Sequence, residues 1–306
     1  MEFQHRSVLL YETIDSLNIQ ENGIYVDGTA GGAGHSKEIA KRLTSGHLYA
    51  LDQDPDAVRV ATERLQGLPA TVIQANFCEM DKVLAERGIT AVDGILMDLG
   101  VSSYQLDNGE RGFSYHQDAP LDMRMSQSGP TAADLVATLS ENELAEIFFR
   151  YGEEKFSKRI ASRIVEERKT TPITTTLQLA ELIAESVPAA ARRDGHPARK
   201  CFQALRIAVN HEMDVLSEVL DKAFDLLAPG GVLSIITFHS LEDRMVKQHF
   251  KTYCTGCTCP PDLPICVCGK TPRGKLLFRK PQEASAEELK ENPRSRSAKL
   301  RAVVKL

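Results

Sequence analysis

The feature that most constrains the fold is a glycine-dense turn between two short apolar runs. The run Ile24–Asp27 ends in an acid and opens into Gly28-Thr29-Ala30-Gly31-Gly32-Ala33-Gly34. A helical pattern follows, and then a second apolar run that also ends in an acid, at Asp52. Glycines at such a turn let a ligand approach the backbone, where side chains would hold it away. This order predicts a βαβ unit that binds a nucleotide-type cofactor across the carboxyl ends of its strands.

The spacing of the glycines indicates which cofactor. A dinucleotide site needs Gly-x-Gly-x-x-Gly. From Gly32 the third glycine position is Lys37, and from Gly28 the second is Ala30, so that register is absent. The pattern favours S-adenosylmethionine, which has no phosphate and carries a sulfonium and an amino group that attract carboxylates. Asp52 lies where it can accept hydrogen bonds from both ribose hydroxyls. A tight turn without a ligand is the alternative.

The wider pattern predicts an α/β domain with a mostly parallel, Rossmann-like sheet. Strands alternate with helices, which is typical of right-handed parallel crossovers. The expected strands are 24–27, 47–52, 71–75, 92–98 and 232–238, with closing strands at 276–278 and 300–304. The expected helices between them are 34–43, 55–66 and 79–88.

A helical insert interrupts this alternation. Residues 105–130 have no clear periodicity, which after a strand end indicates a functional loop or lid. Ser140-x-x-Glu143 is a capping box, and apolar residues at helical spacing follow it. We therefore expect one domain formed by 1–104 and 206–306. Residues 105–205 are expected to form a lid loop and an all-helical substrate-recognition insert.

The sequence closely resembles a known family, the bacterial 16S ribosomal RNA cytosine-N4 methyltransferases (MraW-like). The resemblance covers almost the whole chain. It implies a class I S-adenosylmethionine-dependent methyltransferase domain with an inserted helical domain, and 16S ribosomal RNA as partner. Its motifs are His5-Arg6-Ser7-Val8-Leu9-Leu10, Asp27–Ser36, Asp52-Gln53-Asp54-Pro55, Asp98–Asp107, Arg111-Gly112-Phe113-Ser114, Pro120–Met125, Phe238–Arg244 and Asn292–Ser297.

The resemblance also implies positions for the cofactor contacts: Ala33, Gly34, His35, Asp52, Phe77, Asp98 and Gln105. The chain departs from other amino-methyltransferases after Asp98, where Leu99-Gly100-Val101 replaces Pro-Pro-aromatic. No general base is assigned. The target base has to leave its stack, and the candidates for receiving it are Phe113, Asp122, Arg124, His239 and Glu242. A helix start capped by Ser240 is the alternative for the last two.

Charge is distributed unevenly along the chain. The whole sequence has a net charge of −5, but residues 270–306 contain eleven Lys/Arg and only four Asp/Glu. A basic segment on an acidic body is typical of a chain that holds a polyanion locally. Arg192, Arg193, Arg199 and Lys200 are further candidates for phosphate contacts. A solvated surface is the alternative for both groups.

Five of the seven cysteines fall within fifteen residues. Cys254-x-x-Cys257 and Cys266-x-Cys268 offer four thiolates for a structural zinc site, with Cys259 as a substitute ligand. A reduced cysteine-rich loop is the alternative. The N-terminus lacks a signal-peptide core and no apolar run is long enough to span a membrane. We therefore expect a cytoplasmic protein without membrane attachment and with reduced thiols.

Two other classes of function compete with an RNA methyltransferase. A dinucleotide-dependent oxidoreductase is disfavoured by the broken glycine register. A non-catalytic RNA-binding module with a vestigial cofactor fold is disfavoured because the expected cofactor positions are chemically suitable.

Overall fold

The computed structural model describes residues 7–189, 195–260 and 267–306. Internal contacts divide the chain into two compact units. The first unit consists of Met1–Gly100 and Asp214–Leu306, and the second of Val101–Met213. Within the described residues, no helix combines the length and the hydropathy needed to cross a membrane.

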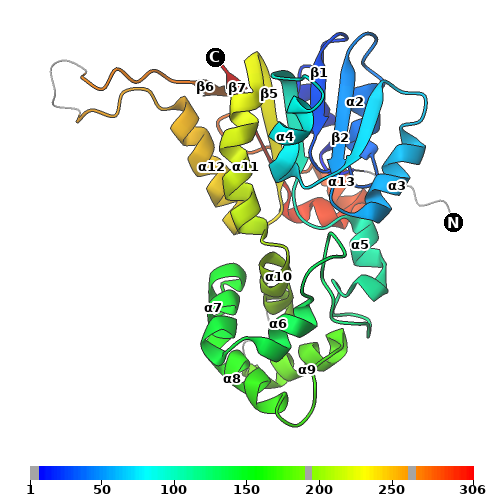
Figure 1. The fold of residues 1–306 in the computed structure, drawn as a ribbon. Helices are drawn as coiled ribbons and strands as arrows, with labels where there is room; N and C mark the ends of the chain where they lie inside the picture. The colour runs from blue at the N-terminus through cyan, green and yellow to red at the C-terminus, as the bar shows by residue number, and fades with distance from the viewer. Residues whose placement is uncertain (1–6, 190–194, 261–266) are drawn as a thin grey trace. The chain divides into compact units, whose positions relative to one another are not determined.

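A seven-stranded sheet in the order β3-β2-β1-β4-β5-β7-β6 forms the centre of the first unit (Figure 1). Strands β1 to β5 pair in parallel, whereas β7 runs antiparallel to both β5 and β6. The mostly parallel α/β fold expected from the sequence is therefore confirmed. The strands are β1 Ile24–Asp27, β2 His47–Asp52, β3 Ala70–Gln74, β4 Val92–Asp98, β5 Leu227–Thr237, β6 Gly274–Leu276 and β7 Lys299–Lys305.

Helices flank this sheet, and local signals set their ends. Asp54 caps α3 by accepting a hydrogen bond from the Asp56 backbone, and Pro55 occupies the first turn, where its missing N–H costs nothing. The helices of this unit are α1 Leu10–Ser16, α2 Gly34–Ala40, α3 Pro55–Arg64, η1 Phe77–Glu79, α4 Met80–Ala85, α12 Ser240–Cys254, α13 Ala286–Glu291 and η4 Pro293–Ser297. Helix α11 (Glu212–Leu226) begins at the boundary between the units.

The sheet is buried on both faces, as continuous apolar strands require. On one face Val26, Ile95 and Leu233 pack with residues of α11 and α12, including Phe224 and Phe250. On the other face Leu48, Ala50 and Leu96 pack with Ile39 of α2 and Ala61 of α3. The rigid sheet between these layers fixes where each strand ends.

One strand start differs from the expected one. The sequence predicts that Pro229-Gly230-Gly231 ends the preceding helix, but α11 ends at Leu226 and β5 begins at Leu227. The glycine pair lies inside β5, where the register against β4 shifts, and Gly230 has a φ of +84°. A bulge of this kind needs a residue that tolerates positive φ.

The second unit is helical. Its elements are α5 Ser103–Asp107, η2 Gly109–Arg111, α6 Ala132–Thr138, α7 Glu141–Gly152, α8 Ser157–Glu167, α9 Thr176–Ser186 and α10 Ala198–Val209. The capping box predicted at Ser140 and Glu143 is present. Helix α10 runs to Val209, past residue 205, where the insert is expected to end. The helical spacing of Cys201, Phe202 and Leu205, all buried, was the signal for it.

The aperiodic stretch before α6 is folded into the core of this unit. Phe113, Leu121, Met123 and Met125 are all buried there. The Arg111 guanidinium donates to the carbonyl oxygens of Arg124 and Met125, at 2.8 and 3.1 Å. Apolar anchors and a buried cation therefore hold residues 112–131, which form no helix or named strand.

Candidate functional site at the carboxyl ends of the strands

Three acids end three neighbouring strands of the sheet. Strand β1 lies between β2 and β4, so the strand order reverses beside it, which is where open α/β sheets bind ligands. Asp27 of β1 pairs in register with Ala50 of β2 and Leu96 of β4. Asp52 and Asp98 therefore lie two residues further along their strands, on either side of the glycine-rich turn.

Asp27 stabilises the glycine-rich turn through hydrogen bonds. Its Oδ1 accepts hydrogen bonds from the backbone N and the hydroxyl of Thr29, at 3.1 and 3.4 Å, and its Oδ2 accepts one from the Ser36 hydroxyl at 2.6 Å. Burial raises the pKa of this carboxyl, although these hydrogen bonds oppose the rise. Asp27 is 1% exposed, so its role is to hold the turn rather than to meet a ligand. Sequence reasoning missed Thr29 and Ser36 as its partners.

Backbone hydrogen bonds attach the turn to the strand ends. Gly28 N donates to Leu96 O and Ala30 N donates to Leu51 O, both at 2.8 Å. A Cβ added at Gly28 would lie 3.1 Å from Phe77 Cβ, so only glycine fits without a shift. Ala33 adopts a φ of +58° directly before α2, a conformation that costs a non-glycine residue energy and often marks a functional turn.

Asp52 faces the turn from the end of β2. Its Oδ2 accepts a hydrogen bond from Gly31 N at 2.8 Å, and its Oδ1 accepts one from Asp54 N at 2.9 Å. A carboxylate oxygen can accept two hydrogen bonds, so both oxygens keep acceptor capacity. Burial raises the pKa of Asp52 to about 6. The residue is half-buried and is suited to accept hydrogen bonds from a vicinal diol.

Asp98 ends β4 with an unsatisfied carboxyl group. Among the described residues, nothing forms a hydrogen bond with its buried Oδ1, while the side chain as a whole is 24% exposed. Burial raises its pKa well above the usual range, and the nearby charges of Asp27 and Glu242 raise it further. A buried acceptor without a partner often marks a place for a ligand. This carboxyl gains most from a cation or an N–H donor brought beside it.

His35 lies next to this carboxyl in the first turn of α2. Its Nδ1 is 3.7 Å from Asp98 Oδ2, and its Nε2 is 3.0 Å from Val8 O. Burial lowers the pKa of His35 to about 4, so the imidazole is neutral near pH 7. The ring therefore adds a polar atom to the site without adding a charge.

Phe77 and Gln105 are the remaining cofactor contacts expected from the sequence. Phe77 begins η1, which Asn76 caps, and it lies half-buried beside Gly28. Its expected place against an adenine stays a prediction. Gln105 belongs to the second unit, where its Oε1 accepts a hydrogen bond from Ser102 N at 2.9 Å. Its expected contact with the cofactor also stays a prediction.

The helix after β5 does not begin with Ser240 as its cap, which was the alternative for this turn. His239, not Ser240, is the N-cap of α12: its Nδ1 accepts a hydrogen bond from Glu242 N at 3.4 Å. Glu242 is buried, and its Oε2 accepts a hydrogen bond from Phe238 N at 2.8 Å. Both side chains therefore stabilise the helix start, and the charge of Glu242 also raises the pKa of Asp98.

The expected base-receiving residues of the second unit are held by their neighbours. The Phe113 ring is 7% exposed, with the Arg111 guanidinium 5.9 Å from its centroid. Arg124 makes a bidentate pair with Asp122, at 2.9 and 2.7 Å. Phe113 is therefore a core residue, while the Asp122–Arg124 pair is half-buried.

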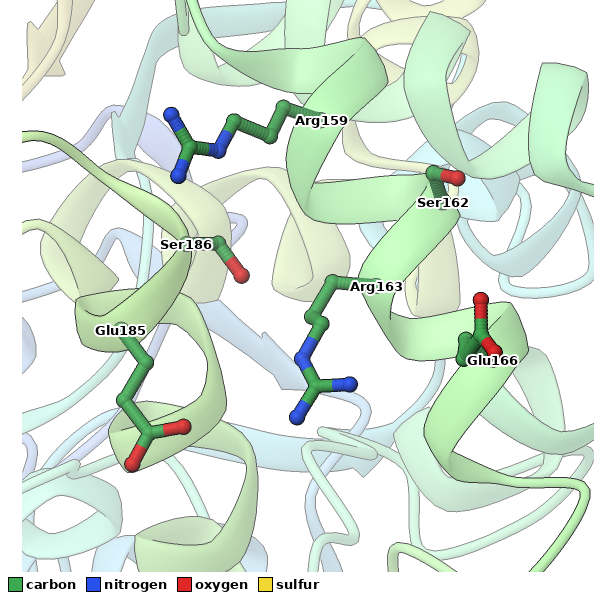
Figure 2. A pocket seen from close by; sticks show the side chains of 6 residues that line it. All are labelled: Arg159, Ser162, Arg163, Glu166, Glu185 and Ser186. Carbon is green, nitrogen blue, oxygen red and sulfur yellow. The ribbon is translucent and has the colours of Figure 1, made fainter.

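A shallow pocket between α8 and α9 does not match a polyanion. Figure 2 shows its lining side chains, which are Arg159, Ser162, Arg163, Glu166, Glu185 and Ser186. Two guanidinium groups face a surface that also carries two carboxylates, so a phosphate gains little net attraction there.

The expected phosphate contacts of the insert are only partly described. Arg192 and Arg193 lie outside the described residues. Arg199 and Lys200 are exposed at the start of α10, and Lys200 Nζ donates to Glu153 O at 3.2 Å. In the basic C-terminal segment, Arg294 and Arg296 are exposed on η4.

The cysteines group differently from the expected set. Cys257, Cys259 and Cys268 come together, whereas Cys254 is absent from this group. Cys254 ends α12 and packs against the hydrophobic core. Cys266 lies outside the described residues.

Comparison with known proteins gives a full-length match. The model of the MraW methylase family matches residues 2–306. Ribosomal RNA small subunit methyltransferase H of Lachnospira eligens is 57% identical, over 98% of this chain and 97% of the relative. The protein of the same name from Clostridium botulinum is 54% identical over 100% of both chains. A solved rRNA methylase of Streptococcus thermophilus is more distant, with 11% identity and a TM-score of 0.44 over 98% of each chain.

Proposed function

The chain belongs to the MraW methylase family of S-adenosylmethionine-dependent methyltransferases, and we propose that it methylates the exocyclic N4 of one cytidine in the decoding region of 16S ribosomal RNA. One observation supports the RNA substrate. The chain shares 54–57% sequence identity, over nearly its full length, with relatives that are named as small-subunit ribosomal RNA methyltransferases. The choice of N4 rests on the motifs set out from the sequence.

The strand-end site supports S-adenosylmethionine as the methyl donor. Asp52 keeps acceptor capacity for the two ribose hydroxyls after it has bonded Gly31 and Asp54. The backbone of Ala33 and Gly34 offers a surface with little side chain to hold a ligand away. The unsatisfied carboxyl of Asp98 favours a neighbouring positive charge. When bound, S-adenosylmethionine supplies a methyl group activated on its sulfonium.

Asp98 is the residue best suited to act on the acceptor base. The lone pair of a cytosine amine is delocalised into the ring, so the amine is a poor nucleophile. An acceptor for one amine N–H favours the geometry in which the lone pair points at the methyl group, and positioning supplies much of the acceleration. The raised pKa of Asp98 lets a carboxyl oxygen hold the proton that the amine loses.

RNA binding requires charge away from this site. The target base has to leave its stack before it can meet the methyl donor. The exposed Arg294 and Arg296 follow a short acidic helix and belong to the basic segment 270–306. Phosphate contacts there would fix the backbone while the base is read at the strand ends.

Nucleoside mass spectrometry of 16S ribosomal RNA tests the product. A strain lacking this protein should lose one N4-methylcytidine, and complementation should restore it. Complementation with the Asp98→Asn variant should restore less of the mark than the wild-type gene does. Retention of N4-methylation in the deletion strain, or loss of a C5-methyl or ribose-methyl mark instead, would overturn the assignment. Labelled methyl transfer to naked RNA and to assembled small subunits then identifies the substrate form.

A further inference from the structure

Three thiols converge in the segment that joins α12 to β6. The ligand atoms of Cys257, Cys259 and Cys268 all lie within 4.8 Å of one another. Figure 1 shows this segment extending away from the sheet of the first unit as two arms. The arms are tied at their base, where Arg273 N donates to Tyr253 O at 2.8 Å. Further along the arms, the Cys257 and Cys268 sulfurs bring the two arms together a second time.

The distances match a metal site better than a disulfide. Cys268 Sγ lies 3.8 Å from Cys257 Sγ. Two sulfurs bound to one tetrahedral zinc ion at about 2.3 Å are about 3.8 Å apart, whereas bonded sulfurs are about 2.05 Å apart. A disulfide would also use only two of the three thiols. The third would remain beside it without a function in the cross-link.

The segment has almost no apolar contacts to hold it. Within residues 255–260 and 267–273, no side chain is buried, and Val267 is 78% exposed. Ordering a chain costs roughly 1–2 kcal/mol per residue in backbone entropy. Small elements without a core usually recover this cost through disulfides or bound metal. A metal ion bound by all three sulfurs would supply such a constraint.

A backbone N–H is directed at one of the three sulfurs. Cys259 N lies 3.4 Å from Cys257 Sγ, in hydrogen-bond geometry. N–H donors directed at sulfur are the second contacts that metal thiolates use.

We propose that Cys257, Cys259 and Cys268 bind a structural zinc ion that joins the two arms of the segment between α12 and β6. Soft sulfur ligands in this arrangement select zinc over magnesium or calcium. Cys254 is not a ligand, because it ends α12 and packs on the core. This ligand set replaces the Cys254-containing set expected from sequence spacing. Methyl transfer needs no metal, so the role of the ion is to order the segment.

Elemental analysis of the full chain tests the site. The protein is purified under reducing conditions without added metal or chelator, and about one zinc per chain is expected. Cys257→Ser and Cys268→Ser should each reduce the zinc content to near zero. The matched controls Cys254→Ser and Cys78→Ser remove thiols outside the cluster and should keep the zinc. Because the segment lies outside the core, thermal melting of all four variants checks that the rest of the chain is folded.

Cobalt substitution gives a second measurement that does not depend on variants. Co²⁺ added to metal-depleted protein should produce thiolate charge-transfer and tetrahedral ligand-field bands, and Zn²⁺ should abolish them. Near-zero zinc in the wild-type protein together with no cobalt spectrum would overturn the proposal. So would iron or copper in place of zinc, a Cys257–Cys268 disulfide in mass spectra of reduced preparations, or loss of zinc from Cys254→Ser.

Discussion

The imidazole of His35 is held between a carbonyl and a carboxyl, with Nε2 3.0 Å from Val8 O and Nδ1 3.7 Å from Asp98 Oδ2. A carbonyl oxygen can only accept, so the proton of the neutral ring is on Nε2. The lone pair of Nδ1 therefore faces Asp98. The raised pKa of Asp98 and the lowered pKa of His35 both disfavour an ion pair between the two side chains.

His35 should make the protein sensitive to acid. Because its folded-state pKa is about 4 and its ordinary value is 6.5, the unfolded chain binds more protons between these pH values. Stability is therefore lost as the pH falls through this window, by up to about 3 kcal/mol. His35→Gln should show a shallower fall in the free energy of unfolding from pH 6.5 to 4. Denaturant unfolding at several pH values measures it. The exposed His116→Gln is the control, and equal slopes for wild type and His35→Gln would contradict the prediction.

Asp98→Asn should separate activity from stability. The amide keeps the shape but loses the charge and the capacity to hold a proton. We expect kcat/KM for methyl transfer to fall about 10–100-fold, which is the loss of one charge-assisted hydrogen bond. The melting temperature should not fall, because the buried, unsatisfied acid is costly to the fold. The exposed Asp15→Asn controls for charge. A large loss of stability with normal kcat/KM would assign Asp98 to the fold alone.

Asp52→Ala should weaken the binding of S-adenosylmethionine by about 1–3 kcal/mol, because charge-assisted hydrogen bonds to the ribose are lost. Calorimetry on the folded variant measures this, with the exposed Glu63→Gln of α3 as the control. The pKa of Asp52 is about 6, so wild-type affinity should rise as the pH passes upward through 6 and the carboxyl ionises. The variant should lack this component. Unchanged affinity would remove Asp52 from the site.

Asn210→Ala should loosen the aperiodic loop of the second unit. Asn210 Oδ1 accepts a hydrogen bond from Met125 N at 2.7 Å, and its Nδ2 donates to Met123 O at 2.8 Å. Met123 has a φ of +63°, a conformation that these contacts help to hold. Losing both bonds should cost about 1–3 kcal/mol and increase amide exchange in residues 121–126. The exposed Gln127→Ala serves as the comparison. Unchanged exchange would show that apolar packing alone holds the loop.

Charge reversal at Arg294 and Arg296 should weaken RNA binding without changing cofactor affinity. Each phosphate contact that is lost lowers the slope of log affinity against log salt by about one. Titration of 16S ribosomal RNA at several salt concentrations, beside calorimetry with S-adenosylmethionine, measures both effects. The exposed Lys41→Glu, at the C-cap of α2, is the matched control. An unchanged slope of log affinity against log salt would remove η4 from the RNA-binding surface.

Local signals in the sequence predicted most of the secondary structure of the sheet domain. The strands that end at Asp27, Asp52 and Asp98 occur where apolar runs stop at an acid. The start of α3 is set by Asp54 and Pro55, which are adjacent in sequence. Hydrophobic periodicity and capping depend on neighbours within a few residues, so the chain alone carries this information.

The cysteine cluster shows what spacing cannot decide. Cys254 and Cys257 have an ordinary metal-ligand spacing, yet α12 continues to Cys254 and directs it to the core, while Cys259 joins Cys257 and Cys268. The loop before α6 is a similar case, because its order depends on Asn210, which lies 85 residues from Met125 in the sequence.

The sequence by itself determined that three acids end three parallel strands beside a glycine-rich turn. Only the tertiary structure decided what each acid can do. Asp27 is buried and bonded to Thr29 and Ser36, Asp52 is half-buried and keeps acceptor capacity, and the Oδ1 of Asp98 is buried without a hydrogen bond within the described chain. The physical reason is that desolvation and hydrogen-bond satisfaction depend on groups brought together from distant strands and helices, which no local pattern encodes.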